Sequence, residues 1–170
     1  LALTLDGLSP GHGLVAGLLA AFVYAQRRGL DTLRTLDALA PGLAIIAAGA
    51  ALADLAAGGS VGVETTLPWG VMQLGERRHP VQVYHLAAAL VIGVGIVMAK
   101  RPFDGARFGL FVACYAASRL LIEPLHADSA LTGELRTVQV VSLAVLTLSL
   151  FGLRWLGQRA LARTAAGGGA

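Results

Sequence analysis

Long apolar stretches alternate with short polar connections along this sequence. Five such stretches cover roughly residues 11–25, 36–58, 81–99, 108–122 and 138–156. A helix needs about 20 apolar residues to cross the hydrocarbon core of a bilayer. The second, third and fifth stretches reach that length, and the first and fourth reach it when flanking residues are included. The pattern predicts an all-α fold, a polytopic membrane helix bundle with about five transmembrane helices.

Composition indicates the solvent that suits these helices. Hydrophobic residues make up 56% of the 170 residues and charged residues 14%, whereas a soluble domain carries about 25% charged residues. Such a chain has too few polar side chains to cover a water-exposed surface, so we expect lipid around the helices. The C-terminal end is small and Gly-rich instead. We therefore expect one membrane-embedded domain over residues 1–160 and a flexible tail over residues 161–170.

The basic residues give the chain an orientation. Three of those in the connections lie on one side of the predicted membrane and nine on the other. The nine are Arg27, Arg28, Arg34, Lys100, Arg101, Arg107, Arg154, Arg159 and Arg163. Because cytoplasmic loops are rich in Lys and Arg, this asymmetry predicts an N-terminus outside and a C-terminus inside. The basic residues form short clusters rather than one face, so we expect no nucleic-acid partner.

Polar residues at the ends of the apolar stretches gather on the outer side in this topology. They are His12, Asp54, His79, His85, Arg119, Glu123 and His126. Arg119 and Glu123 lie four residues apart and share one helix face. They either neutralise each other as a structural pair or form an anion site, in which the guanidinium binds phosphate and Glu123 orients it. The histidine spacing fits no compact ligand motif, so we expect neither a metal nor a cofactor.

Five short blocks resemble the motifs of one family, in the same order. They are D-A-L-A-P-G (37–42) beside D-x-x-A-P, T-T-L-P-W-G (65–70) beside T-D-L-P-W-G, H-P-V-Q-V-Y (79–84) beside H-P-T-Q-L-Y, Y-A-A-S-R-L-L-I-E (115–123) beside Y-G-x-x-R-F-x-x-E, and Q-V-V-S (139–142) beside Q-x-x-S. Each block alone is weak, but their ordered occurrence over about residues 7–145 is specific. On these residues the chain resembles the prolipoprotein diacylglyceryl transferase family.

The resemblance implies a chemistry and a place in the cell. The family transfers a diacylglyceryl group from phosphatidylglycerol to the cysteine of a lipoprotein precursor. It does so at the outer face of the bacterial cytoplasmic membrane, without a metal, and its arginines hold the lipid head group. The lipid-binding set that we expect for a phosphatidylglycerol-like lipid is Asp54, His79, Tyr84, Tyr115, Arg119 and Glu123. If the chain is active, His12, Arg119 and Glu123 are the catalytic candidates.

Several family positions hold a different residue here. An arginine, an asparagine, two acidic residues and a second arginine of the family are replaced, respectively, by Ala51, Asp54, Gly59, His85 and His126. His12 is displaced by one position from the family's histidine, and on a helix one position turns a side chain by about 100°. Loss of an arginine from a phosphate clamp removes charge-assisted hydrogen bonds to the transition state.

Three functions are compatible with this pattern. The first is a degenerate member of the family that serves as a lipid-binding or structural subunit of a larger membrane complex. The second is an active, divergent transferase that moves a diacylglyceryl group from phosphatidylglycerol to a lipoprotein cysteine. The third is an unrelated transporter-like or assembly protein, because small residues and charged positions inside helices also occur there.

Overall fold

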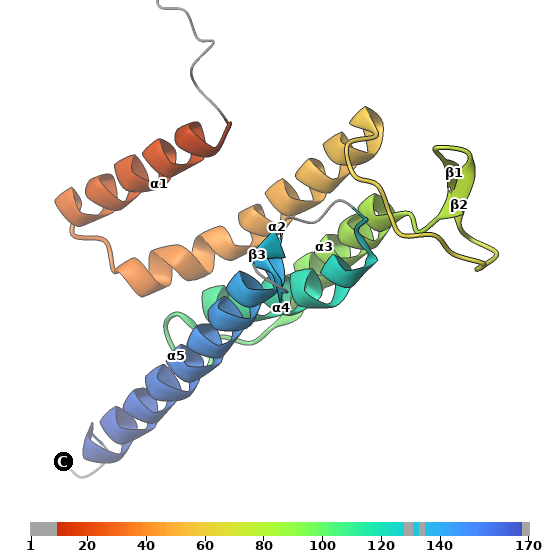
Figure 1. Cartoon of the computed structure of the whole chain (residues 1–170). Coiled ribbons are helices and arrows are strands. Elements are labelled where there is room, and N and C mark those ends of the chain that lie inside the picture. Colours follow the sequence, from red (N-terminus) through yellow and green to blue (C-terminus); the bar gives the residue numbers. More distant parts are fainter. Residues whose placement is uncertain (1–9, 128–130, 133–134, 168–170) are drawn as a thin grey trace, which may run out of the picture.

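The computed structural model describes residues 10–127, 131–132 and 135–167. Most of these residues lie in five α-helices that follow the predicted apolar ranges. The helices are α1 (Pro10–Arg27), α2 (Thr32–Ala57), α3 (Val81–Met98), α4 (Ala106–Ile122) and α5 (Thr137–Gly167). Helix α3 packs against α2 and α4, and α5 packs against α4 (Figure 1). The predicted all-α class is confirmed.

The helices suit a membrane by length and by surface. Within the described part of the chain, α2, α3, α4 and α5 are long and apolar enough to cross a bilayer. Their surfaces carry large apolar side chains, and Ile45, Val91 and Leu148 are 74%, 72% and 70% exposed. Water penalises so much apolar surface, whereas lipid tails solvate it without that cost. The chain is therefore a multi-pass membrane protein, with α1 lying apart from α3–α5 (Figure 1).

Small side chains allow the helices to approach closely. Ala40 and Ala44 of α2 pack with Ile96 of α3 and Phe111 of α4 in a buried cluster. Between α4 and α5 a glycine has the same effect, because a Cβ atom added at Gly109 would lie 2.6 Å from the side chain of Leu153. Small residues at helix contacts are typical of membrane bundles, where van der Waals packing drives association.

A buried carboxylate ties α2 to the start of α4. Asp37 is 1% exposed, and its two oxygens accept hydrogen bonds from the backbone N–H groups of Gly105 and Phe108, each at 2.9 Å. These groups belong to the first turn of α4, which has unpaired N–H groups and a positive dipole end. Asp37 therefore caps a helix other than its own and fixes where α4 begins relative to α2.

The connection between α2 and α3 folds over the end of α4. It contains a hairpin of β1 (Val71–Gln73) and β2 (Glu76–Arg78), paired antiparallel with Val71 opposite Arg78. The backbone of residues 61–63 also pairs with residues 125–127 beyond α4, with Val63 N donating to Leu125 O at 2.8 Å. A side chain at Gly62 would collide with the backbone carbonyl of His79, so this close approach requires glycine.

The structure adds elements that the apolar pattern did not predict. Besides the hairpin, a 3-10 turn η2 (Glu123–Leu125) follows α4, and a short pair of strands, β3 (Leu131–Thr132) and β4 (Leu135–Arg136), precedes α5. Helix α5 continues to Gly167, past residue 160, the predicted end of the domain. The domain boundary and the flexibility of the tail stay predictions, and residues 168–170 lie outside the described part.

Candidate lipid head-group site

A small cavity of about 230 Å³ opens between α2, α3 and α4, under the α2–α3 connection. One wall is made of alanines from α2, and the remaining wall carries polar groups. The lining residues are Ala47, Ala50, Ala51, Asp54, Ser60, His85, Tyr115 and Arg119. The alanine wall leaves room inside the bundle, so the polar groups face space rather than packed side chains.

Arg119 is the strongest donor on this cavity. Its side chain is 31% exposed, and its Nη2 lies 3.6 Å from Oε2 of Glu123, whose side chain is 4% exposed. Its Nη1 lies 3.3 Å from Nε2 of His85, which accepts the hydrogen bond because a guanidinium only donates. At 3.6 Å the contact with Glu123 is an ion pair longer than a hydrogen bond. Guanidinium donors therefore remain available to a ligand.

Asp54 faces the same cavity from the last turn of α2. Its Oδ2 accepts a hydrogen bond from the Ser60 hydroxyl at 2.6 Å, and the Ser60 carbonyl accepts one from the buried Gln82 amide. The helix ends at Gly58 in the left-handed region, φ 62°, which glycine adopts without strain. A Cβ atom at Gly59 would lie 2.5 Å from Oδ1 of Asp54. The loop thus holds the carboxylate in place.

His126 and Arg136 lie next to the C-terminal end of α4, near Arg119 and Glu123. The rings of His85 and His126 lie 5.3 Å apart, and His126 is buried at 9% exposure. Arg136, from the start of α5, donates to the carbonyl oxygens of Glu123 at 2.7 Å and His126 at 2.6 Å. The Glu123 carbonyl also accepts the backbone N–H of His126 at 3.1 Å, so Arg136 adds a charged donor that stabilises the turn carrying Glu123.

The sequence-predicted residues fall into two groups. Asp54, Tyr115 and Arg119 line the cavity, and Glu123 pairs with Arg119 beside it. His79 and Tyr84 instead contact each other at 3.1 Å. They are absent from the cavity lining, so their lipid-binding role stays a prediction. The side chain of His12 lies outside the described part of the structure.

Tyr84 belongs to a separate aromatic cluster at the start of α3. Its hydroxyl oxygen accepts a hydrogen bond from Trp69 Nε1 at 2.9 Å, and it lies 3.1 Å from His79 Nδ1. Adjacent helical residues point about 100° apart, which explains why His85 faces the cavity while Tyr84 does not.

Sequence reasoning left His85 and Ser60 out of the site. His85 had a signal, because it is a polar residue in an apolar helix at a position where the family has an acidic one. Ser60 had none, because its contact with Asp54 depends on how the loop after α2 folds back.

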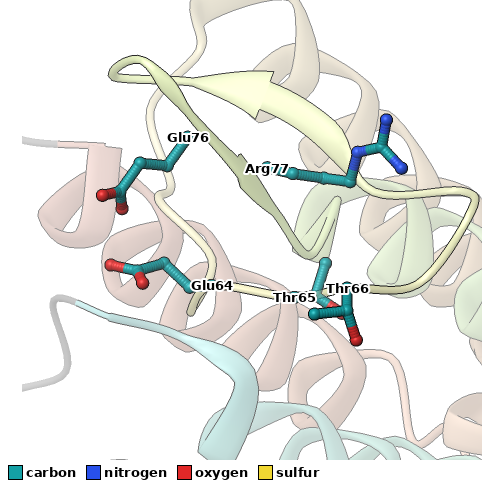
Figure 2. Close-up of a pocket in the computed structure, with 5 residues that line it drawn as sticks. All are labelled: Glu64, Thr65, Thr66, Glu76 and Arg77. Carbon is teal, nitrogen blue, oxygen red and sulfur yellow. The ribbon is translucent and has the colours of Figure 1, made fainter.

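A second, wider cavity of about 550 Å³ lies beside the hairpin and is lined by Glu64, Thr65, Thr66, Glu76 and Arg77. Figure 2 shows the carboxylates of Glu64 and Glu76 turned toward each other and the guanidinium of Arg77 away from them. A hydrogen bond that the protonated Glu64 carboxyl donates to Glu76, together with the negative charge of Glu76, raises the pKa of Glu64. Nη2 of Arg78 bridges the two carboxylates at 3.3 Å and 2.9 Å. This arrangement fixes the hairpin and offers an anion no converging donors.

The chain matches known proteins over most of its length. The profile of the family described as prolipoprotein diacylglyceryl transferase matches residues 1–155. Three relatives carry the name phosphatidylglycerol–prolipoprotein diacylglyceryl transferase. They come from Clostridioides difficile (strain 630), 29% identical over 81% of this chain and 56% of the relative; Gloeobacter violaceus, 31% identical over 87% and 61%; and Trichormus variabilis, 30% identical over 92% and 62%.

The chain spans about three fifths of the length of these curated relatives. The range that the family profile matches includes the positions of Asp37, Tyr115, Arg119 and Glu123. With its multi-pass helical fold and the match over residues 1–155, this chain belongs to the prolipoprotein diacylglyceryl transferase family.

Proposed function

We propose that this chain is a degenerate member of its family that binds a phospholipid head group at Arg119 and transfers no diacylglyceryl group. The observation that carries the proposal is the cavity itself. Arg119 keeps free donors beside an opening of about 230 Å³, and guanidinium donors match phosphate oxygens in geometry and charge. A phospholipid head group supplies such a phosphate at membrane depth.

The proposed lack of transfer rests on residue 51, in the α2 wall of the cavity. Position 51, where the sequence motif of the family has arginine, is alanine, and among the described lining residues Arg119 is the one guanidinium. A single guanidinium binds a phosphate but supplies fewer fixed donors to the charge that develops during transfer. Removing one such donor from an enzyme costs about 10²–10³ in kcat. Binding without transfer suits a lipid-holding or structural subunit of a larger complex in the bacterial cytoplasmic membrane.

The test compares binding with transfer. The purified chain in mild detergent is mixed with phospholipids of matched acyl chains, phosphatidylglycerol included, and bound lipid is counted by native mass spectrometry. We expect retained lipid in the wild type and about tenfold less in Arg119→Gln. Arg34→Gln is the matched control, because Arg34 makes an exposed ion pair with Asp104 at 3.0 Å, away from the cavity. Equal binding by the wild type and Arg119→Gln would show that Arg119 holds no head group.

An active transferase is the second candidate. Arg119 and Glu123 stand at the matching family positions and are paired, and the relatives are named as transferases. In that case Arg119 holds the phosphate, and His12 is the candidate base. Incubation of the purified chain with phosphatidylglycerol and a lipoprotein signal peptide separates the two candidates. Mass gain on the peptide cysteine that Arg119→Gln abolishes would establish transfer and overturn the first proposal.

A further inference from the structure

The charges around the cavity are mixed and balanced. Asp54 and Arg119 are the charged residues of the described lining, and behind them Glu123 and Arg136 add one charge of each sign. His85 adds no fixed charge when its Nε2 accepts from Arg119. A head group with a net negative charge would therefore meet Arg119 favourably and Asp54 unfavourably. Like charges at short range in a partly buried site repel strongly.

The two opposite charges of the lining come from different helices. Asp54 belongs to the last turn of α2 and Arg119 to α4, and alanines of α2 also line the cavity. The Ser60 hydroxyl donates to Oδ2 of Asp54. Oδ1 accepts no side-chain hydrogen bond from the described residues, and Asp54 lines the cavity. A ligand that carries a phosphate at one end and an N–H cation at the other would satisfy both charges.

The size of the cavity restricts the ligand further. Sites for whole drug-sized molecules occupy about 300–1,000 Å³, and this cavity holds about 230 Å³. A head group fits such a volume, whereas its acyl chains must remain outside among the exposed apolar side chains of the helices. A primary ammonium is compact and donates hydrogen bonds to a carboxylate, whereas a quaternary ammonium is larger and donates none.

We propose that this cavity selects zwitterionic phospholipids with a primary ammonium, of which phosphatidylethanolamine is the simplest, over the anionic phosphatidylglycerol-like lipid that the sequence predicts. Arg119 receives the phosphate, and Asp54 receives the ammonium. The proposal rests on the proposed lipid-binding function of the same site and adds its head-group specificity.

The experiment measures preference rather than binding alone. The full chain in mild detergent is offered equimolar phosphatidylethanolamine, phosphatidylglycerol and phosphatidylcholine with matched acyl chains, and bound species are resolved by native mass spectrometry. We expect the wild type to retain phosphatidylethanolamine about tenfold over each of the others. Soluble phosphoethanolamine is added as a competitor, because it carries the same head-group charges without the lipid tails.

Two variants assign the preference to Asp54. Asp54→Asn keeps the size of the side chain and removes its charge, so the phosphatidylethanolamine preference over phosphatidylglycerol should fall to about equal or reverse. Asp104→Asn is the matched control, because that carboxylate is half exposed and pairs with Arg34. It should leave the preference unchanged. The wild-type ratios test the proposal even if Asp54→Asn does not fold.

Each outcome has a distinct meaning. If no lipid is retained, or Arg119→Gln retains as much as the wild type, the proposed function fails. If lipids are retained through Arg119 but phosphatidylglycerol is preferred or equal, the head-group inference is overturned and the proposed function stands. An Asp54→Asn variant with unchanged ratios would likewise overturn it. Displacement of the lipid by equimolar phosphoethanolamine would overturn the assignment to a lipid.

Discussion

Replacement of Asp37 by alanine tests how α2 and α4 are held together. The carboxylate is 1% exposed and accepts two backbone N–H bonds at the start of α4. Hydrogen bonds to a charged group contribute about 1.5–3 kcal/mol each. A negative charge at a helix N-terminus adds about 0.3–1 kcal/mol. Because alanine leaves both N–H groups buried without an acceptor, we expect the free energy of unfolding to fall by about 3–5 kcal/mol.

The assay is unfolding in mixed micelles, with helicity followed by circular dichroism while SDS replaces the mild detergent. Asp37→Asn should lose less than Asp37→Ala, since one amide oxygen still accepts a hydrogen bond without the charge. Asp104→Ala is the control from the same end of the bundle. Its ion pair with Arg34 is exposed on both sides, so its loss should cost about 0–1 kcal/mol.

The cap also predicts where the damage appears. Hydrogen exchange should accelerate at the amides of Gly105 and Phe108 in Asp37→Ala, while the amides of α3 stay protected. An unfolding free energy for Asp37→Ala within about 1 kcal/mol of the wild type would refute the reasoning. So would a loss equal to that of Asp104→Ala, because a buried and an exposed carboxylate would then contribute alike.

Three further predictions concern packing, pH and topology. Gly109→Val should destabilise the bundle by about 1–3 kcal/mol, because its Cβ would meet Leu153 at 2.6 Å; Gly95→Val, with nothing within 4 Å, should not, and SDS unfolding compares them. Because the pKa of Glu64 is raised in the folded protein, the protonated Glu64 side chain stabilises the hairpin at pH values below its ordinary pKa of 4.5. This stabilisation is lost as the pH rises through the folded-state pKa. The protection factors of the β1 and β2 amides, in which the intrinsic pH dependence of exchange is divided out, should therefore rise toward pH 4.5, and Glu76→Gln should remove this rise. In a Cys114→Ala background, Leu30→Cys and Thr132→Cys should react with impermeant reagents from opposite sides of the membrane; labelling of both from outside would contradict the predicted orientation.

The helices could be predicted from the sequence because their apolar stretches are long. The runs of apolar residues indicate which part of each helix suits lipid. Helix α3, for example, begins at the predicted Val81. The apolar runs did not indicate where α5 ends, since residues 157–167, apart from Leu161, are polar or small yet continue the helix. Apolarity reports the membrane, whereas a helix that leaves the membrane continues as long as its residues favour helix.

The hairpin was missed for a different reason. Residues 71–78 show no alternation of apolar and polar positions, and the turn at Leu74 and Gly75 lacks an Asn-Gly or Asp-Gly signal. Leu74 has a positive φ of 54°, a conformation that a leucine in the sequence does not predict. The hairpin forms through contacts beyond its own residues, such as Thr65 N donating to Arg77 O at 2.9 Å.

The site was predictable where it lies within one helix. Arg119 and Glu123 are four residues apart, and their pairing is confirmed. Contacts between different elements could not be predicted from sequence spacing. Examples are the hydrogen bond from Arg119 to His85 and the one from Ser60 to Asp54. A shared sequence motif also does not require a shared cavity, as His79 and Tyr84 show.

Position 51 provides the sharpest test of why the chain would bind a lipid without transferring its diacylglyceryl group. Ala51 lines the cavity and lies three residues before Asp54, so the two side chains are neighbours on one face of α2. An arginine there would reach the cavity and pair with Asp54. Its charge would offset one carboxylate and bring a second set of phosphate donors opposite Arg119.

We therefore expect Ala51→Arg to weaken the preference for phosphatidylethanolamine, and Ala51→Arg combined with Asp54→Asn to favour phosphatidylglycerol by about tenfold. If the missing donor is what prevents transfer, the double variant should also modify a lipoprotein peptide, at a rate about 10²-fold above the background measured with the wild type. Ala51→Met, which fills the same space without charge, separates volume from electrostatics. A double variant that folds and binds phosphatidylglycerol but transfers no faster than the wild type would show that the arginine at this position is not what the chain lacks.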